Sequence, residues 1–119
     1  MRKVGVLLLM LCVLATPLLA ASAYDNATRL AALLADTQGK ASLSATSWKA
    51  IANEANATSN KLYASTKGKN HTAAKEARTH VREMHKCAMK GDADGAKSHA
   101  GMALPYVYQV IDATAPAKK

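Results

Sequence analysis

Apolar residues recur at every third or fourth position through most of this chain, and this period constrains its fold more than any other feature. The clearest stripe, mostly apolar, consists of Trp48, Ile51, Ala52, Ala55, Ser59 and Leu62. Such spacing places side chains on one face of an α-helix. Alternation with period two is absent over any useful length, and β-branched residues are sparse. The pattern therefore predicts an all-α protein.

Capping residues and glycines divide this pattern into four helical segments. The predicted segments are Asp25 to Gly39 with Leu30, Leu33 and Leu34 on one face, then Ser42, Ser44 or Thr46 to Gly68, then Asn70 or Thr72 to Lys90–Gly91, and finally Asp92 to about Ala113. Four short amphipathic helices with short loops predict a small up-down-up-down four-helix bundle. Pro105 falls inside the last segment and predicts either a kink there or a helix end near Leu104.

The N-terminal residues have the order of a secretory signal peptide. Arg2 and Lys3 form a basic start, Val4–Leu14 is apolar, and Ala21-Ser22-Ala23 offers small residues for cleavage. The apolar run is too short to be a membrane span. Residues 1–23 are therefore predicted to be a signal peptide, and residues 24–119 a single exported domain, periplasmic or secreted, with a frayed tail from about residue 114. No stable membrane span is expected after processing.

Charge and motifs exclude several classes of function. The formal net charge is +8, but the lysines are scattered and the aromatic residues few, so no nucleic-acid interface is expected. No Ser/His/Asp arrangement in a known context, pair of catalytic carboxylates or phosphate-binding glycine loop occurs. The chain is therefore predicted to be a binding protein and not an enzyme.

Soft and borderline metal ligands gather in one segment, residues 70–107. It holds all four histidines, three of the five methionines, and Cys87, which is the one cysteine left after signal-peptide removal. A lone thiol in an oxidising compartment cannot form an internal disulfide. Cys87 is therefore a buried small residue, a link between two chains of a homodimer, or a metal ligand.

The third and fourth helices can bring these ligands together. His80, Met84 and Cys87 lie about a turn apart on one face. Antiparallel folding at Gly91-Asp92 places Met84 or His85 opposite His99, Cys87 or Ala88 opposite Ala96, and His80 opposite Met102 and Ala103. The predicted metal ligands are His80, Met84, Cys87 and His99, with His85 and Met102 as secondary candidates; His71, at a helix start, is expected in solvent. Imidazole, thiolate and thioether suit copper, zinc or nickel, and the sulfur content favours Cu(I).

The stretch from His80 to Leu104 resembles the small metal-binding proteins of the bacterial periplasm, which are His-containing four-helix bundles that bind copper, nickel and zinc. His80, Gly91, His99-Ala100 and Leu104 match that pattern, and Cys87 stands where a further histidine is expected. The resemblance implies a bundle with a transition-metal site. Because the first two predicted helices carry no histidine, it implies one or two sites at most.

Two other functions remain open from the sequence. One is a structural or protein-interaction bundle in which histidine, cysteine and methionine are incidental. The other, ranked third, is a haem-binding bundle, although no CxxCH attachment motif and no methionine on the first predicted helix supports it. Within a metal site, Cys87 and His99 are the most informative residues, since one is the strongest soft ligand and the other the sole imidazole of the fourth helix.

Overall fold

The computed structural model describes residues 15–39 and 43–115. Within these residues every regular element is an α-helix, so the predicted all-α class is confirmed. The elements are α2 (Ala15–Gly39), α3 (Ala45–Ala64), α4 (Gly68–Lys90) and α5 (Ala93–Thr114).

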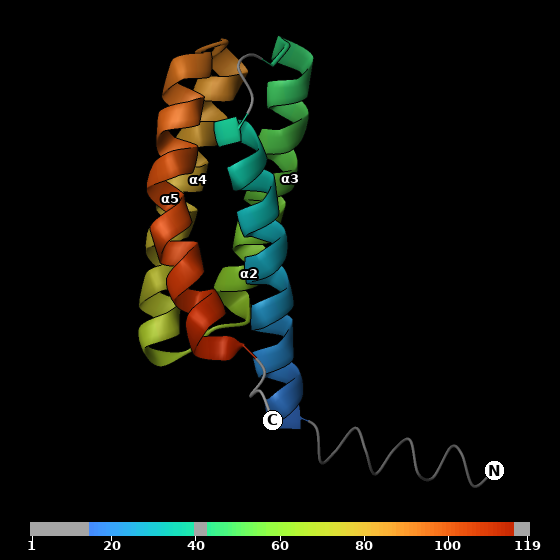
Figure 1. The fold of residues 1–119 in the computed structure, drawn as a ribbon, viewed down its shortest axis with the longest axis vertical. Coiled ribbons are helices and arrows are strands. Elements are labelled where there is room, and N and C mark those ends of the chain that lie inside the picture. The colour runs from blue at the N-terminus through green and yellow to red at the C-terminus, as the bar shows by residue number, and fades with distance from the viewer. Residues whose placement is uncertain (1–14, 40–42, 116–119) are drawn as a thin grey trace, which may run out of the picture.

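The four helices form the predicted up-down-up-down bundle (Figure 1). Each helix packs against the next one in the chain, and α5 closes the ring by packing against α2. The helices on the diagonals hardly touch. Because α4 and α5 are sequential, antiparallel neighbours, side chains on their facing surfaces lie within reach of one another.

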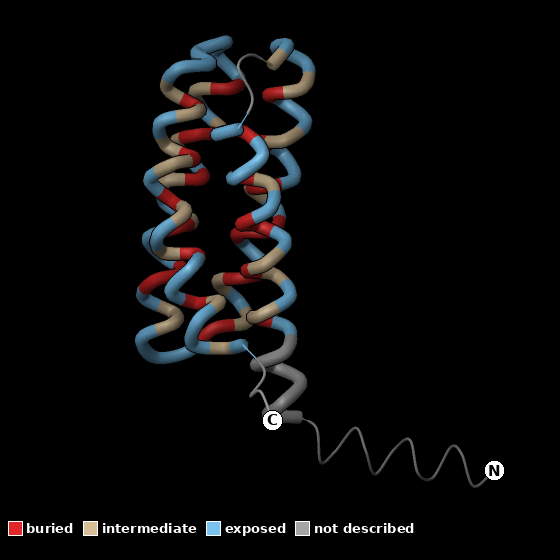
Figure 2. Tube along the Cα trace, viewed as in Figure 1, coloured by how far each residue is buried: buried red, intermediate tan, exposed pale blue. Residues whose placement is uncertain are grey.

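The core follows the stripes that predicted the helices. Figure 2 shows buried positions recurring along the inward side of each helix. Alanines make up much of this core, and its largest fully buried apolar side chains are Leu30, Leu34, Leu62, Val81, Met84, Val107 and Val110. In α5 the last core position is Val110, and Ile111 beside it is only half-buried. An alanine-rich core buries little area per residue, so each of these larger side chains contributes a large share of the stability.

Several predicted helix ends are confirmed by hydrogen bonds. The side chain of Ser44 accepts a bond from the Ser47 amide at the start of α3. Asp92 accepts a bond from the Gly95 amide, 2.9 Å from Oδ1, at the start of α5. Between these helices, Gly91 ends α4 with φ of 81°, a left-handed conformation that glycine adopts without strain.

Other predicted ends are wrong. Asp25 does not begin a helix, because α2 already runs through it from Ala15. Gly68 does not close α3, which ends at Ala64; with φ of 61° it opens α4 instead. Asn70 and Thr72 therefore lie inside α4, whose N-cap, Lys67, makes no side-chain capping bond. Capping residues mark possible helix starts, and here packing of the neighbouring helices selects others.

Pro105 lies within α5, which continues to Thr114, so a helix end near Leu104 is ruled out. The proline is exposed. Its missing N–H removes one bond to the Gly101 carbonyl, but Val107 and Val110 beyond it are fully buried and hold the last turns on the bundle.

The basic and apolar parts of the predicted signal peptide, residues 2–14, and the tail residues 116–119 lie outside the described residues. The predicted cleavage position after Ala23 lies within α2, so cleavage there leaves Tyr24–Gly39 as the first helix of the bundle. Of the described helices, none has the length and apolar character that crossing a membrane requires.

Candidate functional site

Three aromatic rings stack between α4 and α5. His80 of α4 lies between His99 and Tyr106 of α5. The ring centroids of His80 and His99 are 6.1 Å apart with 27° between the planes, and those of His80 and Tyr106 are 5.9 Å apart with 15°. His99 and Tyr106 are seven residues apart, so they share one face of α5 two turns from each other. The stack joins the two helices that carry all of the predicted ligands.

The predicted register of the α4–α5 pair is confirmed by these contacts. The midpoint between His99 and Tyr106 falls at Met102 and Ala103, which is the predicted partner position of His80. Farther along, a Cβ placed on Gly95 would lie 2.8 Å from the Cys87 sulfur, so Cys87 is opposite the Gly95–Ala96 turn as expected.

One ring nitrogen of His99 has no partner. Its Nδ1 is buried and accepts or donates no hydrogen bond among the residues that the structure describes. A buried polar atom without a partner costs about 1–3 kcal/mol. A metal ion bound at Nδ1 would give this nitrogen a partner. A metal ion bound at the other ring nitrogen would suit the ring as well, if Nδ1 then turned to a hydrogen-bond partner. His99 is therefore the residue that best fits a metal.

Cys87 is half-buried near the α4–α5 turn, where it hydrogen-bonds the Asp92 side chain. Partial burial raises the pKa of its thiol, and the negative charge and hydrogen bond of Asp92 raise it further. Glu83 acts in the same direction and Lys90 in the opposite one. The thiolate, which is the metal-binding form, is thus disfavoured until an ion displaces the proton.

The two methionine candidates have opposite surroundings. Met84 is fully buried in the core, whereas Met102 is 47% exposed. Met102 follows His99 by three residues and so lies on a neighbouring part of the same α5 surface. Its thioether is available from solvent, while that of Met84 serves packing.

The other two histidines are each engaged elsewhere. His85, a secondary candidate, faces α3, where its Nε2 lies 2.8 Å from Asn53 Oδ1. His71 was expected in solvent, and this was wrong: it is half-buried, its ring centroid lies 4.1 Å from that of Tyr63, and its Nδ1 lies 3.1 Å from the Thr66 carbonyl oxygen. Both contacts arise because α4 begins earlier than predicted, which places His71 in its first turn beside the end of α3.

The predicted four ligands do not converge on one point. Among the described residues, no three His, Cys, Asp or Glu side chains gather closely enough to hold one ion. Along α5, His99 lies about 5 Å from the level of Cys87 and about 5 Å from that of His80, at 1.5 Å per residue. His99 is thus between the two, with the His80 ring as its direct neighbour.

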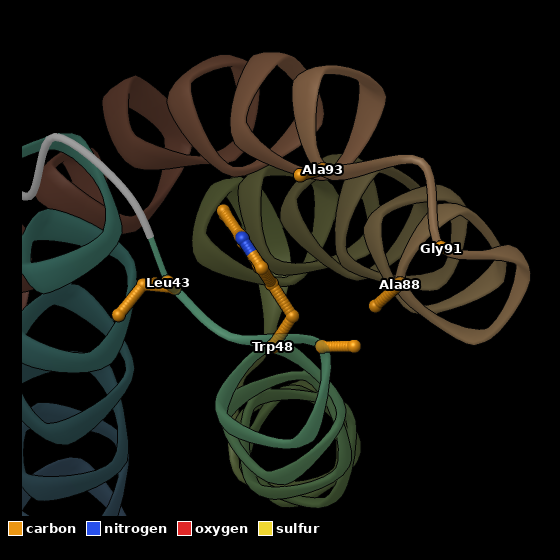
Figure 3. A pocket seen from close by; sticks show the side chains of 6 residues that line it. Leu43, Trp48, Ala88, Gly91 and Ala93 are labelled. Carbon is orange, nitrogen blue, oxygen red and sulfur yellow. The ribbon is translucent and has the colours of Figure 1, made fainter.

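An apolar cavity of about 150 Å3 lies at the end of the bundle that holds the α4–α5 turn (Figure 3). Trp48 reaches into it from α3, opposite Ala88 and Ala93, and Gly91 and Leu43 complete much of the wall. These residues supply no carboxylate, imidazole or sulfur atom. The cavity therefore adds no ligand to the ring stack.

Tyr106 was not among the predicted site residues, although its spacing of seven from His99 could have identified it as part of the same face. Asn53, the partner of His85, carried no comparable signal, because its role depends on the packing of α3 against α4. Comparison with protein-family models, with curated proteins and with solved structures finds no match for this chain.

Proposed function

We propose that this chain is an exported metal-binding protein, without catalytic activity, that holds one soft or borderline transition-metal ion between α4 and α5 through His80 and His99. The observation that carries the proposal is the adjacency of these two imidazoles together with the unpartnered Nδ1 of His99. The predicted signal peptide supports export. The resemblance of residues 80–104 to periplasmic metal-binding bundles points in the same direction.

The separation of the rings is compatible with a shared ion. Metal–nitrogen bonds to imidazole are about 2 Å long, so one ion bound to both rings holds their centroids at most about 6 Å apart. The observed separation is 6.1 Å, so side-chain rotation with little backbone movement brings a nitrogen of each ring to the ion. The stack holds the His80 ring beside His99, and an ion that binds both imidazoles turns the rings out of this stacked arrangement.

Copper(I) is the ion that these residues favour. Zinc takes four ligands in structural sites, and two imidazoles supply half of them. Copper(I) accepts fewer ligands and tolerates sulfur, which the exposed Met102 can supply beside the imidazoles. Cys87 remains a predicted further ligand, whose raised pKa makes its participation increase with pH.

The competing function is a structural or interaction bundle. Its specific support is the geometry of the stack itself, since near-parallel rings at 5.9 and 6.1 Å fill the α4–α5 surface and stabilise the helix pair without a metal. The two functions differ in what removal of the imidazole does to metal affinity.

The test is a titration of the reduced, metal-free protein with Cu(I), Zn(II) and Ni(II) against a competing chelator. We expect stoichiometric Cu(I) binding that raises the unfolding temperature, because an ion that binds only the folded state stabilises it. His80→Ala and His99→Ala should each weaken binding at least tenfold, or about 1.4 kcal/mol.

His71→Ala and His85→Ala are the matched controls, because each removes one imidazole from α4 outside the stack. Both should retain the affinity of the natural sequence. Equal, small losses from all four substitutions would show that the histidines bind metal only as independent surface groups, and would favour the structural function.

A further inference from the structure

A polar cavity of about 310 Å3 opens between α3 and α4, on the side of α4 that faces away from the ring stack. All of its lining side chains are polar, and those that matter here are Asn56 and Asn60 from α3 and Arg82, Glu83, His85 and Lys86 from α4. Its size is at the lower end of the range of about 300–1,000 Å3 for small-molecule sites. It differs from the apolar cavity of Figure 3 both in chemistry and in the helices that form it.

The cavity contains one positive charge without an opposite partner. Glu83 pairs with Lys86 at 3.2 Å, so these two charges offset each other. Arg82 makes no ion pair with any residue in the described part of the chain. The guanidinium offers a planar set of donors suited to an oxyanion. The cavity is therefore electrostatically suited to a small anion.

Asn56 provides the second, independent observation. Its Oδ1 is buried and lacks a hydrogen-bond partner among the described residues. The neighbouring Ser59 hydroxyl of α3 donates its hydrogen bond to the Asn56 backbone carbonyl oxygen at 2.9 Å, so it is not the partner of Asn56 Oδ1. Among the described residues nothing bonds to Oδ1, and Asn56 lines the cavity, so a donor bound there can reach this oxygen once the amide turns toward it.

An anion that also carries an O–H group can pair with the Arg82 guanidinium and donate a hydrogen bond to the Asn56 oxygen. We infer that this cavity, formed by Asn56, Asn60 and Arg82, binds a phosphate group. At neutral pH phosphate is partly protonated, with a pKa in the region of about 6–7. Its P–O–H donates to Asn56 Oδ1, while its other oxygens accept from the Arg82 guanidinium and the Asn60 amide. Sulfate and a carboxylate carry no proton at this pH, so neither donates a hydrogen bond to Asn56 Oδ1.

His85 closes one end of the cavity because its Nε2 is held 2.8 Å from Asn53 Oδ1. Tyr63 lies one turn beyond Asn60 on α3, and the guanidinium of Arg78 from α4 lies 3.6 Å over the centre of its ring, which keeps this second guanidinium on the aromatic face. Among the described residues that line the cavity, Arg82 is thus the cation without an ion pair, and the site involves none of the residues proposed to hold the metal.

The experiment is an NMR titration of the full chain, in a phosphate-free buffer at constant ionic strength and neutral pH, with inorganic phosphate, sulfate and acetate in parallel. We expect saturable shifts at Asn56, Asn60 and Arg82 with phosphate, at a dissociation constant of about 1 mM for so open a site. Sulfate and acetate should bind at least fivefold more weakly. Equal binding of the three anions, or shifts without saturation, overturns the proposal.

Glycerophosphate distinguishes two sources of the same chemistry. Saturable binding with the affinity of inorganic phosphate shows that an esterified phosphate, as in a lipid headgroup, is accepted. Clearly weaker binding of the ester assigns the site to free phosphate. Either result requires that inorganic phosphate itself binds.

Two variants test the named residues. Arg82→Gln should abolish saturable binding, whereas Arg29→Gln, which removes the same charge from α2, should leave it unchanged. Asn56→Leu should weaken phosphate binding at least fivefold while the unfolding temperature stays the same or rises, since it replaces an unpaired buried oxygen by apolar atoms of similar shape. A lower unfolding temperature with unchanged phosphate affinity would assign Asn56 a structural role and contradict the proposal.

Discussion

Substitutions of Met84 distinguish most clearly between a side chain that packs the core and one that binds metal. Its side chain is fully buried, and most of the surrounding core consists of alanines, which cannot extend into a vacated space. Met84→Ala should therefore lower the free energy of unfolding by about 3 kcal/mol, within the range of about 2–5 kcal/mol for such substitutions. In a domain of this size that is a drop of more than about 10 °C in unfolding temperature.

Thermal unfolding of the metal-free protein, followed by circular dichroism, measures this loss. Met102→Ala is the matched control, because the same atoms are removed from a side chain that is 47% exposed, and it should cost less than about 0.5 kcal/mol. Met84→Leu nearly conserves volume and should cost less than about 1.5 kcal/mol while Cu(I) affinity is retained. The reasoning is refuted if Met84 and Met102 cost the same, or if Met84→Leu lowers Cu(I) affinity as much as His99→Ala does.

Three further predictions concern the helix ends. Gly91→Ala should destabilise the fold by about 1 kcal/mol, because Gly91 has φ of 81°, while Gly39→Ala, at a helix end with open space around it, should change the unfolding temperature little. Asp92→Asn keeps a good capping residue but removes the charge beside Cys87, so the pKa of that thiol should fall, which ultraviolet titration of thiolate absorbance measures; an unchanged pKa would show that Asp92 does not raise it. His71→Ala should lower the unfolding free energy by about 1 kcal/mol through loss of the Thr66 and Tyr63 contacts, as denaturant unfolding would show, and a neutral effect would return His71 to the solvent-exposed role first expected.

The sequence was sufficient for the fold because helical period is a local property. The spacing of residues such as Trp48, Ala52 and Ala55 predicted both a helix and its buried face. The antiparallel register of α4 and α5 also followed, since the left-handed Gly91 and the Asp92 cap leave a very short turn. The start of α4 at Gly68 did not follow, because the signals at Asn70 and Thr72 were as good locally, and tertiary packing made the choice.

The candidate site was predictable only in part. That His80 lies opposite Met102 and Ala103, about one turn from His99, follows from register, but which side chains meet there depends on packing among all four helices. Met84 took a core position, and His85 turned to Asn53 of α3, a partner that no pattern within residues 70–107 could indicate. The polar cavity at Asn56 lies between α3 and α4. The helical period predicts which residues share that face of each helix, but it does not predict which charged side chains form ion pairs there.

Imidazole nitrogen NMR of the reduced protein, recorded before and after one equivalent of Cu(I), tests the central proposal most directly. The four histidines report separately, so the ligands are identified without any substitution. We predict large changes at the ring nitrogens of His80 and His99, and unchanged signals from His71 and His85. Changes confined to His71 or His85, or small and equal changes at all four, would contradict a metal site between α4 and α5.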